Sequence, residues 1–206
     1  MKVFEYRGIR GLVAAEVIKD DLDGMEFGTP FEIAGVSELG KTTETSSEPH
    51  YYDNVAALVI DSVGADEVSM STSAIPFSVL AKITGQFYDA TRGLFVEGER
   101  KSKYFAIGYI TKRTDGVEVF VWRLKGTFNI PDSTHNTEDN GTDANGQELV
   151  YTGIHTTHKF ELTADGVTEK KTAKAVNLEQ DINPQNETEF FATVHTPDDI
   201  SAPAAA

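Results

Sequence analysis

The chain has 206 residues, no cysteine and a formal net charge of −15 at pH 7. Without cysteine it can form neither a disulfide framework nor a thiolate metal site. Strong negative charge disfavours nucleic-acid binding, because affinity comes mainly from cations that neutralise phosphates. No apolar run approaches the roughly 18 residues of a membrane helix, and residues 1–10 lack the apolar core of a signal peptide. We therefore expect a soluble, unexported protein that is not associated with a membrane.

The charge is unevenly distributed along the sequence. Residues 1–75 carry a net −9, residues 76–130 a net +4, and residues 131–206 a net −10. An acidic surface favours solubility, which is the simplest interpretation. A second interpretation is that the acidity repels nucleic acid from a surface that it must pass.

The first third of the chain predicts strands, turns and one long polar loop. Residues 3–18 read as an arm leading into a strand, and residues 20–24 as a turn. Residues 25–39 are strand-like. Residues 41–54 are rich in Thr, Ser and Glu and end in Tyr51-Tyr52-Asp53, which predicts a loop that is either mobile or ordered by a partner. The adjacent tyrosines favour the partner, because tyrosine is enriched in interfaces.

A strand pair and one helix follow. Residues 55–63 and 67–73 predict two strands joined by a turn at residues 64–66. Pro76–Thr84 predicts a short helix, with proline in its first turn and Gly85 as its C-cap. About nine residues are marginal as an isolated helix, so the helix must pack on a sheet.

Residues 104–128 predict the central hairpin of the fold. Two runs of β-branched and aromatic residues flank Asp115-Gly116, which supplies the positive φ of a tight turn. Both faces of these strands are apolar, which is typical of a pair covered on two sides. One cover is the domain core; the other is either the chain's own helix or a neighbouring subunit.

The last third predicts further strands and a C-terminal extension. Residues 130–146 read as a surface loop, and residues 147–163 and 167–176 as strands joined by a hairpin turn at Asp165-Gly166. Residues 177–186 read as a linker, residues 188–195 as a last strand, and residues 196–206 as a frayed tail. The prediction is thus a β-domain over residues 1–176 with an N-terminal arm, and an extension over residues 177–206. The fold class is mainly β, an antiparallel sandwich or barrel with one short flanking helix and long loops.

The sequence carries no catalytic or cofactor-binding motif. His155 and His158 fall three residues apart on a predicted strand, where their rings point to opposite faces. Asp139, Asp143 and Asn145 lack the spacing and the closing Glu of a calcium loop. We expect no enzyme activity, no cofactor and no metal site.

Short segments occur along the chain in a characteristic order. They are Gly8–Leu12, Phe27–Pro30, Ile33–Leu39, the acidic loop into Tyr52–Asn54, Pro76–Gly85, Phe95–Gly98, Ala106–Tyr109, Val121–Trp122 and Lys125–Phe128. In this order the chain resembles the major tail proteins of long-tailed, non-contractile bacteriophages, in particular the group typified by staphylococcal and other Gram-positive phages. The resemblance extends to about Val176.

The resemblance implies a tail tube protein. Its subunits are expected to form hexameric rings that stack around a tape-measure protein into a hollow tube, through which DNA passes without specific binding. The expected partners are other copies of the chain, the tape-measure protein, and the tail terminator and distal tail proteins. The expected location is the virion tail, assembled in the cytoplasm of the infected bacterium.

The polar loop then becomes the candidate assembly site. Its residues are Thr42, Thr43, Glu44, Glu48, Tyr51, Tyr52 and Asp53. The basic middle block between acidic ends suggests head-to-tail contacts between copies. Two alternatives stay open: a ring-forming secretion-system tube protein, and a carbohydrate-binding β-sandwich module, which would need an exposed aromatic platform.

Overall fold

The computed structural model describes residues 3–137 and 145–202. Antiparallel strands make up 55% of it and helices 8%, which confirms the predicted mainly β fold class with a curled sheet and a short helix. The strands are β1 (Tyr6–Asp21), β2 (Gly24–Phe27), β3 (Phe31–Glu32), β4 (Val36–Tyr52), β5 (Val55–Thr72), β6 (Phe87–Asp89), β7 (Leu94–Val96), β8 (Phe105–Arg113), β9 (Glu118–Phe128), β10 (Asp132–Ser133), β11 (Gln147–Gly153), β12 (Phe160–Ala164), β13 (Val167–Lys171) and β14 (Ala175–Glu179). The helices are α1 (Phe77–Thr84), α2 (Glu187–Phe190) and the 3-10 turn η1 (Pro197–Asp199).

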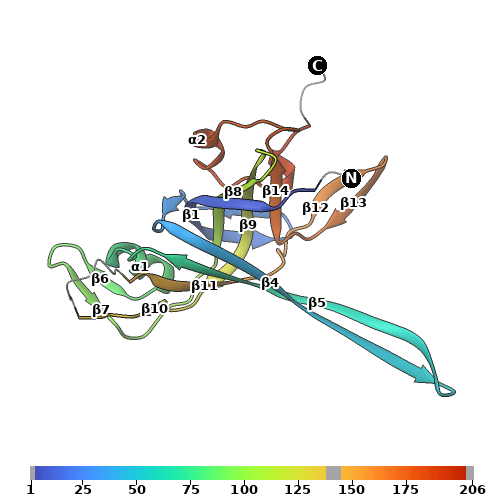
Figure 1. Cartoon of the computed structure of the whole chain (residues 1–206), viewed down its shortest axis with the longest axis horizontal. Coiled ribbons are helices and arrows are strands. Elements are labelled where there is room, and N and C mark those ends of the chain that lie inside the picture. The colour runs from blue at the N-terminus through green and yellow to red at the C-terminus, as the bar shows by residue number, and fades with distance from the viewer. Residues whose placement is uncertain (1–2, 138–144, 203–206) are drawn as a thin grey trace.

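One large sheet organises the molecule. Its strand order is β2-β1-β8-β9-β11-β5-β4, and β3, β10 and β14 pair with β1, β11 and β9. Strands β6 and β7 form a separate two-stranded ribbon, as do β12 and β13. Figure 1 shows β4 and β5 leaving the body of the molecule as a long hairpin, with α1 and the β6–β7 ribbon at the other end.

The β8–β9 hairpin lies at the centre of the sheet, and its two faces are apolar as predicted. One face, with Phe105, Ile107 and Val121, belongs to a core cluster that also contains Leu80 and Ile83 of α1. The other face belongs to a second cluster, whose buried members are Ala15, Ala106, Ile110, Phe120, Trp122, Leu124, Phe160, Phe190 and Val194. The second cover is therefore the chain's own C-terminal segment, rather than α1 or a neighbouring subunit.

The predicted last strand over residues 188–195 is wrong, because the segment forms α2 and a compact turn. The side chain of Asn186 caps α2 by accepting a hydrogen bond from the Glu189 N–H. Phe190 packs on Phe120 with ring centroids 5.3 Å apart, while Phe191 packs on Trp122 at 5.5 Å. Adjacent residues of a strand point to opposite faces, so a strand could not place both rings on this one surface.

The boundary predicted after Val176 falls inside an element of the sheet. Strand β14 runs across it and pairs with β9 from Ala175 to Glu179. Leu178 of β14, and Phe191 and Ile200 beyond it, pack against the second core cluster. The segment after residue 176 is thus packed on the body as far as the structure describes it.

Two other predicted elements have different bounds. Residues 55–73 were predicted as two strands and a turn, but residues 55–72 form the single 18-residue strand β5. Residues 147–163 form β11 and β12 with a loop between them, because Thr156 turns the chain by donating to the carbonyl of His158 at 2.8 Å. The turn at Asp165-Gly166 is confirmed, with φ of 52° and 78°.

The predicted helix is confirmed as α1 with Gly85 as its C-cap. Gly85 has φ of 72° and donates its backbone N–H to Ala81. A Cβ at this position would lie 2.0 Å from the carbonyl oxygen of Lys101. Only glycine therefore fits here, on grounds of both backbone conformation and space.

We predict that Phe190→Ala lowers the free energy of unfolding by about 3–5 kcal/mol, because it empties the second core cluster. Phe87→Ala, at a phenylalanine that is 58% exposed, should cost less than about 1 kcal/mol. Urea unfolding followed by Trp122 fluorescence measures both. If both variants lower the free energy of unfolding equally, the C-terminal segment does not cover the sheet.

Candidate functional site

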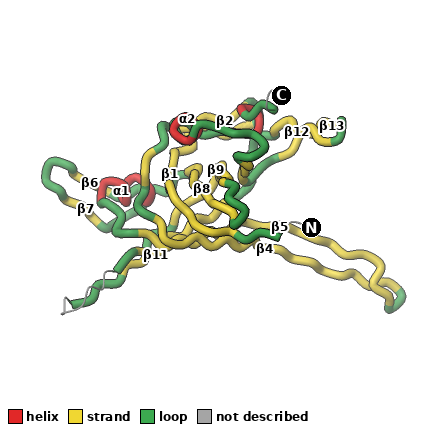
Figure 2. The backbone as a smooth tube through the Cα atoms, turned by 45° about the horizontal axis from the view of Figure 1, so that its top comes forward, coloured by secondary structure: helices red, strands yellow, loops and turns green. Residues whose placement is uncertain are grey.

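The most distinctive feature of the molecule is the outer part of the β4–β5 hairpin, residues 43–65, here called the arm. Strand β4 pairs with β5 from Val36 to Tyr52, but β11 pairs with β5 only over Asp66–Thr72. Beyond Asp66 the hairpin is therefore two strands wide. At the usual rise of about 3.3 Å per residue, the nine steps from Thr43 to Tyr52 span about 30 Å. Figure 2 shows the arm extending from the body without a layer above or below it.

A tight turn closes the arm at its tip. Asp53 and Asn54 have φ of 50° and 64°, so both central residues are left-handed. Two-residue hairpin turns of this kind match the twist of the flanking strands, and Asp and Asn tolerate the conformation better than most residues. The turn sets the register that pairs Tyr52 with Val55.

The arm exposes an apolar strand. The outer half of β5 carries large aliphatic side chains that are all more than half exposed: Val55, Leu58, Val59, Ile60 and Val63. They do not share one face. Leu58 and Ile60 lie opposite His50 and Glu48 on one face, while Val59 and Val63 lie opposite Pro49 and Thr45 on the other.

One edge of this apolar strand is also unpaired. Within the described residues, the edge of β5 that pairs with β11 over Asp66–Thr72 has no strand partner from Val55 to Ala65. Half of its backbone N–H and C=O groups there point away from β4. Such an edge is a template for pairing with another strand.

Together these features make the arm a candidate interaction surface. A two-stranded hairpin in water is at best marginally stable without packing on one face, and contiguous exposed apolar surface marks binding sites. The arm also carries four carboxylates and no cation, at Glu44, Glu48, Asp53 and Asp61. A partner of the arm would need to offer apolar surface, and basic side chains around that surface would suit the charge of the arm.

A buried ionic network fixes the arm to the body at Asp66. Its carboxylate is 3.0 Å from both the Arg123 guanidinium and the Lys174 ammonium, and it accepts a hydrogen bond of 2.9 Å from Thr43. Lys174 also donates to the backbone oxygen of Gly64. Burial raises the pKa of Asp66, but the hydrogen bonds from Lys174 and Thr43 outweigh it, so the pKa lies below its ordinary value.

One buried tyrosine, Tyr109, extends this network into the core, and a second, Tyr151, is bonded separately to the backbone of β8. Arg123 donates from Nε to the hydroxyl of Tyr109 at 3.2 Å, and the hydroxyl of Tyr151 donates to the carbonyl of Phe105 at 2.9 Å. Burial raises the pKa of Tyr151 well above its ordinary range, so the phenol stays a neutral donor. The arm is thus tied to the strands of the central hairpin through β9.

The seven predicted assembly residues all lie on the β4 half of the hairpin. The structure does not bring them together but spaces them along the hairpin. Thr42 and Thr43 lie at its root, Glu44 and Glu48 along its length, and Tyr51, Tyr52 and Asp53 at its tip. The structure brings one of them, Thr43, to the ionic network. Their role in assembly stays a prediction.

The predicted form of that segment, a loop, is wrong. Residues 41–52 belong to β4, and they lack an alternating apolar pattern because neither face of the arm is buried in the subunit. Sequence analysis also missed that residues 55–63 are exposed, since an apolar run reads as a core strand. The Asp53-Asn54 step between two β-prone runs was the signal that could have identified the hairpin.

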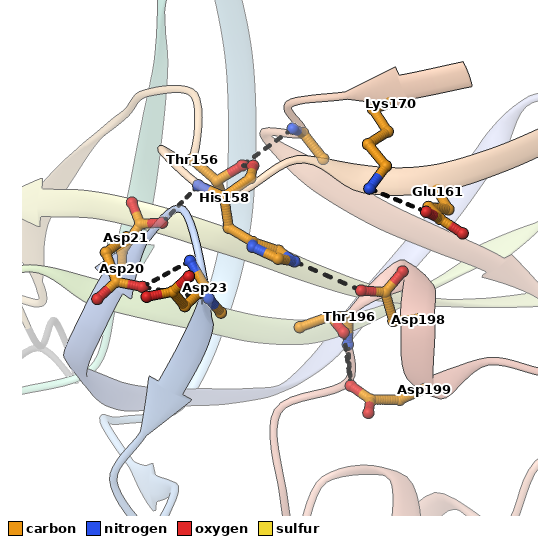
Figure 3. A network of polar contacts seen from close by, with 12 residues as sticks. Asp20, Asp21, Asp23, Thr156, His158, Glu161, Lys170, Thr196, Asp198 and Asp199 are labelled. Carbon is orange, nitrogen blue, oxygen red and sulfur yellow. Dashed lines mark hydrogen bonds and ion pairs between the residues drawn. The ribbon is translucent and has the colours of Figure 1, made fainter.

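A second polar cluster joins the β1–β2 turn to the C-terminal segment (Figure 3). Asp20 accepts the backbone N–H groups of Thr157 and His158, as well as the Lys125 ammonium at 2.6 Å. His158 lies 3.5 Å from the Asp198 carboxylate. Burial raises the pKa of Asp20, but these donors lower it by more. The cluster joins the end of β1 to the β11–β12 loop and to η1, and it borders an open hollow of about 420 Å³.

The described residues contain no group of three or more His, Asp or Glu side chains placed to hold a metal ion. Asp139 and Asp143 lie outside the described residues. His155 and His158 lie in the loop between β11 and β12, rather than on a strand as predicted. None of the helices formed by residues 3–137 and 145–202 has the length and apolarity needed to cross a lipid bilayer.

We predict that Asp66→Asn destabilises the protein by about 3 kcal/mol at pH 7, because it leaves two buried cations without their carboxylate. Asp61→Asn, at an exposed position of the same strand, is the matched control and should change stability by less than about 0.5 kcal/mol. Urea unfolding at several pH values measures the difference.

The sign of the pH dependence follows from the lowered pKa of Asp66. The ionised carboxylate stabilises the fold above about pH 5, and this stabilisation is lost as the pH falls below about 4. The difference in the free energy of unfolding between the wild type and Asp66→Asn should therefore become smaller as the pH is lowered. A gap that stays constant down to about pH 3 would contradict the network's role.

Comparison of the chain with models of known protein families, and with curated proteins, gives no match.

Proposed function

We propose that this protein is a structural subunit of a phage tail tube, in which hexameric rings of the chain stack into a hollow conduit for DNA. The observation that carries the proposal is the arm, an exposed apolar hairpin with an open edge. In a monomer, such a surface would stay exposed to water and would not contribute to stability. A subunit that packs against other copies covers it on assembly.

The sheet itself supports side-by-side association of subunits. Its two end strands are β2 and β4, and among the described residues neither the outer edge of β2 nor the outer edge of β4 at its root, residues 36–42, pairs with a further strand. Sheets with open edges can join into a larger continuous sheet. In a ring of subunits, such joining would give the inner barrel that the sequence resemblance implies.

The charge of the chain suits a conduit. The net charge of −15 disfavours binding to phosphates, so DNA could pass an acidic bore without being held. The tape-measure protein would occupy the bore during assembly, and terminator and distal tail proteins would close the two ends. The place of action would be the virion tail, after assembly in the cytoplasm of the infected bacterium.

The two alternatives fare differently. A ring-forming secretion-system protein could use the same arm, and it differs by forming rings that do not stack. A carbohydrate-binding module needs exposed aromatic platforms, but Trp122 is fully buried and donates its indole N–H to the carbonyl of Phe190 at 3.3 Å. No tryptophan is thus available for a sugar, and we favour a structural role without catalysis.

We predict that the purified protein forms hollow tubes or stacked rings in negative-stain electron microscopy over a concentration series. A variant in which residues 44–63 are replaced by Asn-Gly keeps the root network and a short hairpin turn. It should fold with a melting temperature within a few degrees of the wild type and yet not assemble. Light scattering measures assembly, and circular dichroism measures folding.

Three results would count against the proposal or part of it. If the truncated variant forms tubes as readily as the wild type, the arm is not required for assembly. A strictly monomeric wild type, alone and with candidate tape-measure and tail-tip proteins from the same genome, would contradict a tube subunit. Rings that never stack would favour the secretion-system alternative.

A further inference from the structure

The β6–β7 ribbon carries a second exposed apolar surface. Phe87 pairs with Val96 and Asp89 with Leu94, so these four side chains share one face. Phe87, Leu94 and Val96 are between 41% and 58% exposed. We call these three residues the acceptor face.

The other face of the ribbon is already used by the fold. Phe95 packs against the first core cluster and stacks on Phe77 of α1, with ring centroids 5.2 Å apart and planes 5° apart. The inward side chains hold the ribbon on the body, whereas no described residue covers the outward ones. A two-stranded ribbon that is apolar on both faces is suited to packing between two layers.

The acceptor face and the arm lie at opposite ends of the molecule. Figures 1 and 2 both show the ribbon beside α1 at one end and the tip of the arm at the other. The arm of a subunit therefore points away from its own acceptor face. A contact between the two surfaces joins different copies head to tail, and such heterologous contacts continue from copy to copy.

The charges of the two surfaces are complementary. Residues 82–103, which include the ribbon, carry five basic and three acidic side chains, while the arm carries four carboxylates and no cation. Lys101 is exposed and makes no ion pair within the described residues. Arg92, at the turn of the ribbon, pairs with Asp89 at 2.7 Å, but its side chain is still 67% exposed. Opposite charge favours this pairing and disfavours an arm-to-arm contact, which would place eight carboxylates together.

We propose that the acceptor face receives the arm of a second copy of this chain. The aliphatic side chains of β5, such as Leu58 and Ile60, would pack on Phe87 and its neighbours, with the carboxylates of the arm near Arg92 and Lys101. The inference rests on the proposed function, because it names the surface at which stacked subunits meet. A second copy is a better candidate than an unrelated partner, because one chain carries both apolar surfaces, the acidic arm and the basic region around the acceptor face.

Cysteine cross-linking tests the contact directly, because the chain has no cysteine of its own. Ser62→Cys places a thiol on the arm, and Ala90→Cys places one at the turn of the ribbon. Ala164→Cys, an exposed alanine on the separate β12–β13 ribbon, is the matched control. Differently tagged single-cysteine variants are mixed in pairs with a short bismaleimide and resolved on gels.

The expected result is a cross-linked product for the arm with Ala90→Cys at least about tenfold above that for the arm with Ala164→Cys. Equal yields for both pairs would overturn the inference. Predominant arm-to-arm products would overturn it as well. An arm that cross-links only to a different protein in cell extract would also overturn it, by identifying another occupant.

A second measurement separates this inference from the proposed function. Phe87→Ser should raise the concentration needed for assembly about tenfold, whereas Val167→Ser, at an equally exposed residue of β13, should leave it unchanged. Tubes that form equally with both variants, without the arm-to-ribbon product, would refute the acceptor face and leave the tube intact. A specific arm-to-ribbon product in chains that never form tubes would refute the tube and keep the contact.

Discussion

The β8–β9 hairpin is apolar on both faces, and this one constraint determines how the rest of the chain is arranged. Two covers are required, and the chain supplies both, with α1 and its neighbours on one side and the segment around α2 on the other. Trp122 shows how close the second cover is, because a Cβ at Gly108 would lie 2.9 Å from both its ring and that of Phe191. The subunit thus buries its central strands by itself.

The same principle explains what remains exposed. The internal covers reach only the centre of the sheet, and both the outer half of β5 and the outward face of β6–β7 lie beyond them. The apolar side chains in these two places cannot be stabilised within the subunit. In the proposed assembly, the stability of the arm would be coupled to association, because the free energy that normally folds a hairpin onto a core would be gained on binding another copy.

Much of the fold could be predicted from sequence because its signals are local. The Asp115-Gly116 turn, the Pro76 and Gly85 ends of α1, and the runs of β-branched and aromatic residues in β8 and β9 each depend on a few neighbouring residues. The arm could not be located in this way. Residues 55–63 have the composition of a buried strand, and burial depends on which distant segments cover them. The strand predicted around Phe190-Phe191 is wrong for a related reason. Both rings pack on the same face of the sheet, against Phe120 and Trp122, and this long-range contact leaves no local signal in the sequence.

Pro49 makes the two edges of the arm unequal as sites for strand addition. The register between β4 and β5 continues without irregularity from Thr45 to His50, so the nitrogen of Pro49 faces the outer edge of β4. That edge lacks a donor in its middle and carries acidic side chains, which are features that natural sheets use to block strand addition. The edge of β5 has neither a proline nor more than one charge between Val55 and Ala65. Along the arm, strand addition is thus favoured at the edge of β5 and disfavoured at the outer edge of β4, which would give association through the arm one direction.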